Sequence, residues 1–211
     1  MRQKNEGSGR IRYLLDDEEL SLKQTVVKMF PEHLPELVIA IGTGVRKSEQ
    51  YTLDWNQIDF NRKVVKLKKT KNHLAREVPM NSDVLAAFEE LRGDRKTPAG
   101  RVFSIANSKG WFESARGKSG VTDFRGHDCR HTFCSRLAMA GVPLKTIQVL
   151  AGHKTIAITA RYAHLAPNTL HTAVELVTQI PVRIQYEQPP EQPSTKKGAI
   201  ANQIKGHGNR L

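Results

Sequence analysis

The side chains of this chain that could do chemistry are concentrated between His127 and Tyr162. His127 and Arg130 are three residues apart, which is about one turn if the segment is helical. His153 follows Gly152, and Tyr162 comes nine residues after His153. Two imidazoles, a guanidinium and a phenol can together grip a phosphate, move a proton and offer an oxygen nucleophile. The segment therefore indicates chemistry at a phosphate group.

The order of these residues resembles the signature of the tyrosine recombinases, the family of the phage integrases. The resemblance rests on the segment from His127 to Arg130, on the Ala-Gly-His at 151–153, and on Tyr162. It covers roughly residues 11–178. A set of residues in this order and spacing is more specific than any single motif.

The resemblance implies two more residues upstream, an arginine after a Thr-Gly turn and a lysine in a β-turn before a Val-Pro. Arg46 follows such a turn at 43–45, although most arginines simply lie on a surface. Lys71 precedes the Val-Pro at 78–79, and Lys69 is its nearest alternative.

The resemblance also implies a reaction, in which a DNA strand is cut and rejoined through a covalent 3′-phosphotyrosyl intermediate without metal or ATP. Arg46 and Arg130 would oppose the charge that develops on the non-bridging oxygens, because guanidiniums donate paired hydrogen bonds. Tyr162 would be the nucleophile, since a phenol is a better leaving group than an alkyl alcohol when the link is reversed. Lys71 would protonate the departing 5′-oxygen.

Histidine fits two further tasks because it exchanges protons near neutral pH. By resemblance, His127 would carry the proton of the tyrosine and His153 would donate a hydrogen bond to the phosphate, but the sequence alone does not separate these roles. We interpret His131 as a structural residue or as a neighbour that packs the site. Glu49 is expected to orient a basic neighbour without a chemical role of its own.

Seven lysines and arginines and no acid lie between residues 62 and 76, where the pattern predicts a β-hairpin with strands at 64–67 and 75–78. Lysines commonly protect sheet edges, which is the alternative interpretation for most of them. The residues that we expect to contact DNA come from this hairpin and from both sides of the tyrosine: Lys68, Lys69, Arg76, Arg161 and His164.

Other interpretations exist for individual residues. Tyr162 could be a half-buried core tyrosine, which is the commoner fate of that residue type. His127 and His131 are four apart and could bind a metal on one helical face. The intervening residues lack the glutamate of a zincin, however, and there is no Cys-x-x-Cys pair. We therefore expect no metal and no other cofactor.

The composition supports a polyanionic partner. The 211 residues include 33 Lys and Arg against 21 Asp and Glu, a formal charge of +12, and the sequence pI is about 9.9. Such an excess is typical of proteins that bind a polyanion, and the resemblance implies that this partner is double-stranded DNA, although a basic protein without such a partner is possible. Besides a strand-exchange enzyme, a catalytically inert DNA-binding module and a type IB topoisomerase-like enzyme remain alternatives.

Cys129 and Cys134 lie five residues apart, point away from each other on a helix, and are expected to be reduced. The sequence shows no signal peptide and no apolar run that could span a bilayer. These features predict a cytoplasmic protein, and the resemblance implies that a prokaryote or a phage encodes it.

The expected fold class is α+β and mostly helical, with a small antiparallel β-sheet packed on a helical core as in the catalytic domains of tyrosine recombinases. Residues 104–126 are expected to be irregular, with one helical turn near Trp111, and the helix at 128–140 should face inward through Phe133, Leu137 and Ala140. Helices are expected at 16–30, 34–41, 47–53, 81–91, 128–140, 144–150, 155–161 and 170–177, and a short buried strand at 102–103.

Three regions are expected along the chain: a linker remnant at 1–10, a catalytic domain at 11–180, and a disordered, basic, proline-rich tail at 181–211. Almost nothing precedes residue 11, so we expect the catalytic domain without the N-terminal clamp of the family. DNA binding should then be weak and strongly salt-dependent. The resemblance further implies a monomer when free and a homo-tetramer on DNA.

Overall fold

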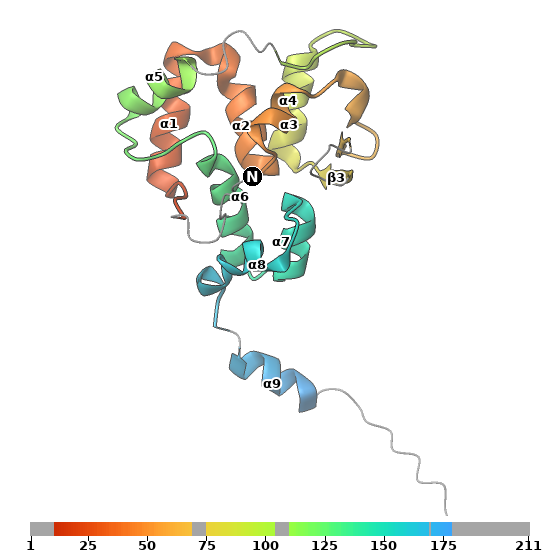
Figure 1. Ribbon diagram of the computed structural model, residues 1–211. Helices are drawn as coiled ribbons and strands as arrows, with labels where there is room; N and C mark the ends of the chain where they lie inside the picture. The colour runs from red at the N-terminus through yellow and green to blue at the C-terminus, as the bar shows by residue number, and fades with distance from the viewer. Residues whose placement is uncertain (1–10, 69–74, 104–109, 169, 179–211) are drawn as a thin grey trace, which may run out of the picture. The chain divides into compact units, whose positions relative to one another are not determined.

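The computed structural model describes residues 11–68, 75–103, 110–168 and 170–178 (Figure 1). The chain divides into two units between Asn168 and Thr169. The second unit contains the helix α9 (Leu170–Thr178), which was expected from the apolar spacing. Lys69, Lys71, the linker at 1–10 and the tail at 181–211 lie outside the described residues. The remaining paragraphs concern the first unit.

Two helices open the first unit, and both begin and end as local chemistry predicts. α1 (Asp16–Met29) has four acids in its first turn, where the helix dipole favours negative charge. The Glu18 carboxylate accepts a hydrogen bond from the backbone N–H of Leu15 at 3.0 Å, which satisfies one donor at this helix end. α2 (Leu34–Thr43) follows a 3-10 turn, Pro31–His33, and is capped by Gly44 in the left-handed conformation.

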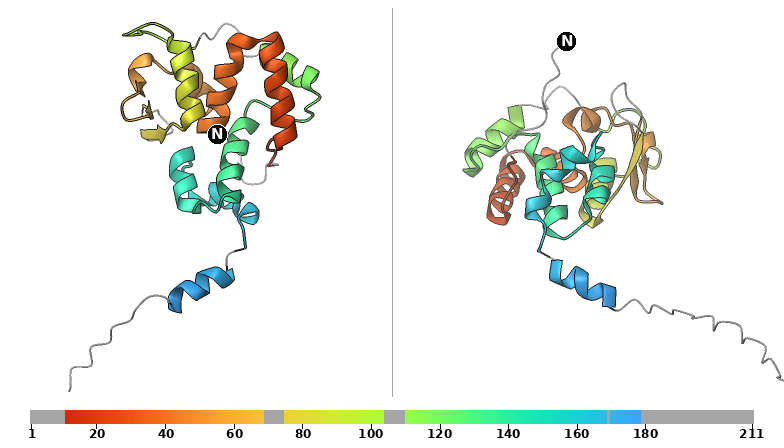
Figure 2. Two further views of the ribbon diagram at one scale, coloured as in Figure 1. Left: turned by 180° about the vertical axis from the view of Figure 1, so that it is seen from behind. Right: turned by 60° about the horizontal axis from the view of Figure 1, so that its bottom comes forward.

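A third helix, α5 (Gly110–Ser119), replaces the mostly irregular segment that we predicted. Trp111, Phe112 and Ala115 form its buried face, and they join Leu22 and Val26 of α1 in one apolar cluster. Both sets of views show α5 beside α1 (Figures 1 and 2). The prediction was wrong because the glycines, serines and cations around this short face conceal its helical spacing.

The sheet has three antiparallel strands in the order β1-β2-β3: β1 (Ile58–Asp59), β2 (Val64–Leu67) and β3 (Arg76–Pro79). β2 and β3 form the predicted hairpin, in which Val65 pairs with Val78. Those two valines pack on Val84 and Phe88 of α4 (Ser82–Arg92). The Asn81 side chain caps α4 by accepting a hydrogen bond from Val84 N at 2.9 Å, as predicted.

Two details of this region differ from expectation. The strand β1 was not predicted, because two residues are too short to show an alternating pattern. Val102 and Phe103 do not form a strand, although Phe103 is buried as expected. Instead, Arg101 makes a single bridge to Asp54. The expected fold class is nevertheless confirmed, since a small antiparallel sheet packs on a mostly helical core.

Four further α-helices lie in the unit: α3 (Lys47–Tyr51), α6 (Asp128–Met139), α7 (Leu144–Ala151) and α8 (Ile156–Ala160). It also has 3-10 turns at Trp55–Gln57 and Ala163–Leu165. The predicted inward face of α6 was partly wrong. Ala140 is exposed, whereas the small residues Cys134, Ser135 and Ala138 are buried. Small side chains let neighbouring elements approach this helix closely. The buried face of α6 is also more polar than the apolar pattern indicates.

Two findings bear on the general class of the protein. Cys129 and Cys134 are buried and not bonded to each other, in agreement with the prediction of reduced thiols. Burial raises the pKa of the Cys129 thiol to about 12. None of the helices in the described ranges combines the length and apolar character that a bilayer crossing needs.

Gly44 is a close contact point between α2 and α6. Its φ of +60° is a conformation that side chains disfavour, and a Cβ atom there would overlap the ring of Phe133. Only glycine therefore permits this turn and this packing together.

We predict that Gly44→Ala lowers the free energy of unfolding by about 2–5 kcal/mol, the sum of a left-handed backbone penalty and an overpacking penalty. Gly141→Ala is the matched control, because Gly141 also has a positive φ, of +76°, but no atom of the described chain lies within 4 Å of the added Cβ. It should lose only about 1–2 kcal/mol. Urea denaturation measures both, and equal losses would contradict the proposed contact.

Candidate active site

Arg46 and Arg130 come from different elements and lie in one place. Arg46 is at the start of α3, and its Nη2 donates to the carbonyl of Gly152 at 3.1 Å. Arg130 is in the first turn of α6, and its Nη1 donates to the carbonyl of Gly44 at 2.7 Å. Burial, and then the charge of Arg46, lower the pKa of the Arg130 guanidinium to about 10. The two arginines are therefore electrostatic neighbours.

The guanidinium of Arg130 is buried but incompletely paired. The residue is only 3% exposed. Its Nη2 has no hydrogen-bond partner among the residues that the structure describes. A buried donor left unpaired costs roughly 1–3 kcal/mol, and more when the group is charged. An anion placed against Nη2 would remove this cost.

Glu49 is the carboxylate beside this pair of arginines. It accepts hydrogen bonds from Arg46 N at 2.9 Å and from Arg46 Nη1 at 3.2 Å. Arg76 adds two parallel bonds, at 2.9 and 2.8 Å. Burial alone would raise the pKa of the Glu49 carboxyl, but Arg76 and Arg46 instead lower it to about 2. Glu49 therefore stays charged, and its carboxylate is bonded to both Arg46 and Arg76.

The position of Arg76 does not fit the DNA contact that we predicted for it. Its side chain is 8% exposed, and both ends of the guanidinium are occupied by Glu49. The Nε also donates to the carbonyl of Leu150 at 3.3 Å. A side chain covered and paired in this way has little left to offer a DNA backbone.

Tyr162 lies in the same region, between two histidines. The residue is 1% exposed. Its hydroxyl oxygen is 2.6 Å from Nδ1 of His131, and its ring is stacked nearly parallel to the ring of His153 at 6.3 Å. Burial, and then the nearby Cys134, raise the pKa of the Tyr162 phenol well above its ordinary value. The phenol therefore keeps its proton at neutral pH.

His153 is held in its neutral form. Burial, and then the charges of Arg130 and Arg46, lower the pKa of the His153 imidazole to about 3. Its Nδ1 lies 2.9 Å from the hydroxyl oxygen of Thr159 in α8. The Gly152 carbonyl binds Arg46, so the turn at 152–153 connects a guanidinium and an imidazole directly.

The histidine in contact with the phenol is His131 rather than His127. The His127 ring lies edge-on to the His131 ring at 5.2 Å, as expected for residues four apart on α6. We had interpreted His131 only as a packing neighbour, and we had not identified Thr159. The helical spacing was visible in the sequence, but the partner across the fold was not.

The other residues expected at the site are more peripheral or lie outside the described ranges. The side chain of Lys68 is 63% exposed and lies 3.3 Å from Asp54. Arg161 lies 6.0 Å from the ring of Tyr162, and His164 is exposed. Lys69 and Lys71, which were expected in the hairpin turn, are not among the residues that the structure describes.

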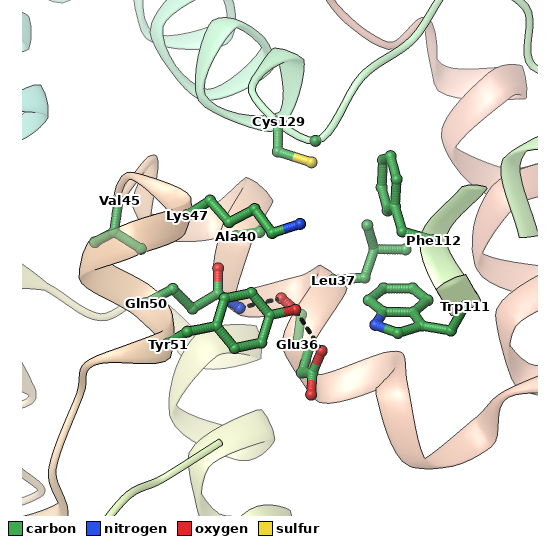
Figure 3. Close-up of a pocket in the computed structure, with 11 residues that line it drawn as sticks. Glu36, Leu37, Ala40, Val45, Lys47, Gln50, Tyr51, Trp111, Phe112 and Cys129 are labelled. Carbon is green, nitrogen blue, oxygen red and sulfur yellow. Dashed lines mark hydrogen bonds between the residues drawn. The ribbon is translucent and has the colours of Figure 1, made fainter. Parts of the chain in front are cut away.

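A separate small pocket lies between α2, α3 and α5 (Figure 3). Its volume is about 40 Å³. The Tyr51 hydroxyl and the Gln50 amide both donate to Glu36 at its edge, and Cys129 points toward it (Figure 3). None of the predicted catalytic residues lines the pocket, which has room only for small molecules such as water.

A helical core with a small antiparallel sheet thus brings two guanidiniums, two histidines and a tyrosine to one site that can accept an anion. This chain belongs to the phage integrase family, whose model matches residues 17–169. The match confirms the resemblance seen in the sequence.

Individual relatives agree with this assignment. The integrase of Salmonella phage P22 is 33% identical over 150 residues, which cover 62% of this chain and 38% of that protein. A tyrosine recombinase XerC-like protein of Caldanaerobacter subterraneus is 29% identical over 189 residues, covering 68% and 48%. The chain thus spans between about two fifths and one half of the length of these curated relatives.

Solved structures show the same fold. The catalytic domain of bacteriophage HP1 integrase matches with a TM-score of 0.65 and 27% identity, over 79% of this chain and 95% of that one. The Tn1549 transposon integrase, solved in complex with circular intermediate DNA, matches with a TM-score of 0.65 and 26% identity, over 82% of this chain and 68% of that one.

The low pKa of His153 predicts a pH dependence of stability. Between pH 6.5, its ordinary value, and about 3, the unfolded chain binds a proton at this residue that the folded chain does not. The free energy of unfolding should therefore fall as the pH is lowered through this window.

His153→Asn can keep a hydrogen bond to Thr159 but cannot titrate. We expect its stability to change less between pH 6.5 and 5 than that of the wild type, by up to about 1.4 kcal/mol per pH unit. Both proteins contain Glu49, whose pKa is about 2 in the folded chain, so its titration contributes equally to the two curves and cancels in their comparison. Urea denaturation at several pH values tests this, and identical slopes in the two proteins would contradict it.

Proposed function

We propose that this chain is the catalytic domain of a site-specific DNA recombinase. It cuts and rejoins DNA strands through a covalent link between Tyr162 and the 3′-phosphate, without metal or ATP. The observation that carries the proposal is the buried guanidinium of Arg130, with Nη2 unpaired among the described residues, next to Arg46 and Tyr162.

The charges at the site suit a phosphodiester. Arg46, Arg76 and Arg130 bring three positive charges, and Glu49 brings one negative charge. This excess supports a substrate that carries its own negative charge. As Tyr162 attacks, further charge develops on the non-bridging oxygens, and fixed guanidiniums in a site with little water oppose it strongly.

The nucleophile needs a proton acceptor, because burial keeps the phenol protonated. We propose that His131 takes the proton, since its Nδ1 is the atom 2.6 Å from the phenol oxygen. Tyr162 is covered, so a phosphate reaches its oxygen only after neighbouring side chains shift, and the proposed proton transfer requires the hydrogen bond to His131 to persist through that shift. His127, beside His131, is the next group along the path.

In this cleavage step, each bond that forms is matched by a bond that breaks. A bond forms between the Tyr162 oxygen and phosphorus, the bond from phosphorus to the 5′-oxygen breaks, and the phenol proton passes to His131. Lys71 gives a proton to the departing 5′-oxygen, a role supported by the family signature. The reverse attack by a DNA 5′-hydroxyl rejoins the strand.

Double-stranded DNA is the proposed partner. The formal charge of +12 supports it, as does the related Tn1549 integrase solved with DNA. We propose that Lys68, Lys69, Arg161 and His164 contact the DNA backbone, that the protein is a monomer when free, and that it assembles as a homo-tetramer on paired sites. The phage and bacterial relatives support a cytoplasmic setting.

The alternatives from the sequence are less well supported. An inert DNA-binding module has no use for a tyrosine held between two histidines beside paired arginines. The family match likewise favours a recombinase over a type IB topoisomerase-like enzyme.

We predict that incubation with a nicked suicide duplex containing the target site yields a covalent protein–DNA adduct on a denaturing gel. Tyr162→Phe should give none, because it lacks the attacking oxygen. A comparable adduct from Tyr162→Phe would assign the nucleophile elsewhere. Failure of the wild type to form any adduct on its own site would remove the recombinase proposal.

His131→Asn tests the proton acceptor, because asparagine can replace the hydrogen bond at the Nδ1 position but cannot take a proton. We expect adduct formation to slow by about 10²–10⁴-fold. A duplex with a 5′-bridging sulfur, which leaves without protonation, should restore Lys71→Ala but not His131→Asn. Wild-type rates for His131→Asn, or its rescue by the sulfur substrate, would refute the assignment.

A further inference from the structure

We propose that Arg76 is a positioning residue, which keeps Arg46 available to the DNA phosphate by occupying both carboxylate oxygens of Glu49. The inference rests on the proposed function, since it concerns the same site. It also replaces the DNA contact that the sequence suggested for Arg76.

The first support is the unequal pairing of Glu49 with its two arginines. Arg76 donates two bonds, at 2.9 and 2.8 Å, in the paired geometry that binds carboxylates most strongly. Arg46 donates a single side-chain bond at 3.2 Å, together with its backbone N–H. Glu49 is therefore engaged mainly by Arg76, although it lies on the same short helix as Arg46.

The second support is burial. The side chains of Arg76 and Glu49 are 8% and 10% exposed. A carboxylate in such surroundings stays charged only because cations surround it, and its pKa of about 2 reflects this. Without Arg76 it would still be charged at neutral pH as long as Arg46 remained beside it.

The consequence follows from the donors of Arg46. A guanidinium has five N–H groups, and among the residues that the structure describes the side chain of Arg46 uses one on Glu49 and one on the Gly152 carbonyl. The others can face a phosphate. If Arg76 were lost, Glu49 would draw Arg46 into a paired, two-bond contact and withdraw one of these donors from the substrate.

Arg76 is also fixed from its other side, at the end of α7. Its Nε donates to the Leu150 carbonyl. Gly152 has a φ of +66°, and a Cβ there would lie 2.7 Å from the Arg76 guanidinium. The strand β3 is thereby tied to the turn that carries His153 and binds Arg46, so Arg76 joins three parts of the site.

The test compares Arg76→Met, Glu49→Gln and the double variant. The rate of adduct formation is measured with a saturating nicked suicide duplex, at a temperature where circular dichroism shows each protein folded. We expect Arg76→Met to lower the rate about 10–100-fold, a typical loss for a residue that orients a catalytic group. If Arg76→Met is a hundredfold slower than the wild type, the double variant should be at least tenfold faster than Arg76→Met, because Glu49 can no longer compete for Arg46.

Two further readouts separate positioning from other roles. The dissociation constant for DNA and its dependence on salt should be unchanged in Arg76→Met, whereas loss of a phosphate contact lowers the salt slope by about one. Lys68→Met, directly after the neighbouring strand β2, is the control for such a loss. The rate defect of Arg76→Met should also shrink on a duplex with an uncharged methylphosphonate at the cleavage site, where Arg46 matters less.

If Arg76→Met does not fold, Arg76→Lys replaces it, since it keeps the charge but cannot make the paired contact, and a smaller loss with the same pattern is expected. A wild-type rate, additive losses in the double variant, or a reduced salt slope would each overturn the inference. An inactive wild type would instead overturn the proposed function.

Discussion

The site depends on one carboxylate that two guanidiniums share, beside a third guanidinium that bonds to a backbone carbonyl. Glu49 neutralises part of the charge of Arg46 and Arg76, and Arg130 is left with the carbonyl of Gly44. Backbone carbonyls carry only partial charge, so the cluster keeps a positive excess that water does not fully screen. Holding this positive excess inside the protein costs free energy, and an anionic substrate would remove that cost. The neighbouring titratable groups respond to the same positive potential.

Two uncharged side chains beside the arginines show this response most clearly. His153 and Tyr162 stack on each other beside the positive cluster, and both are held neutral. A neutral imidazole can donate to a phosphate without adding repulsion to the arginines, and a neutral phenol needs a nearby base before it can attack. In the mechanism that we propose, the contact between Tyr162 and His131 supplies that base.

Two glycines make this crowding possible. Gly44 and Gly152 both have left-handed backbones, both direct a carbonyl at an arginine, and both lie where a Cβ would collide with a neighbouring side chain. The turns after α2 and α7 are therefore part of the site. Their carbonyls accept hydrogen bonds from the arginines without bringing the full negative charge of a carboxylate, so the positive charge of the site is kept.

The sequence by itself determined the parts that follow local rules: the acids that open α1, the Asn81 cap, the hairpin of β2 and β3, and the family signature around Arg130 and Tyr162. It missed α5 and the polar inward face of α6, where short or small-residue patterns carry little local signal. Only the tertiary structure decided that Arg76 pairs with Glu49 and that His131 meets the phenol. Residue type and spacing along one element are fixed locally, whereas a partner 27 or 31 positions away is chosen by how the elements pack.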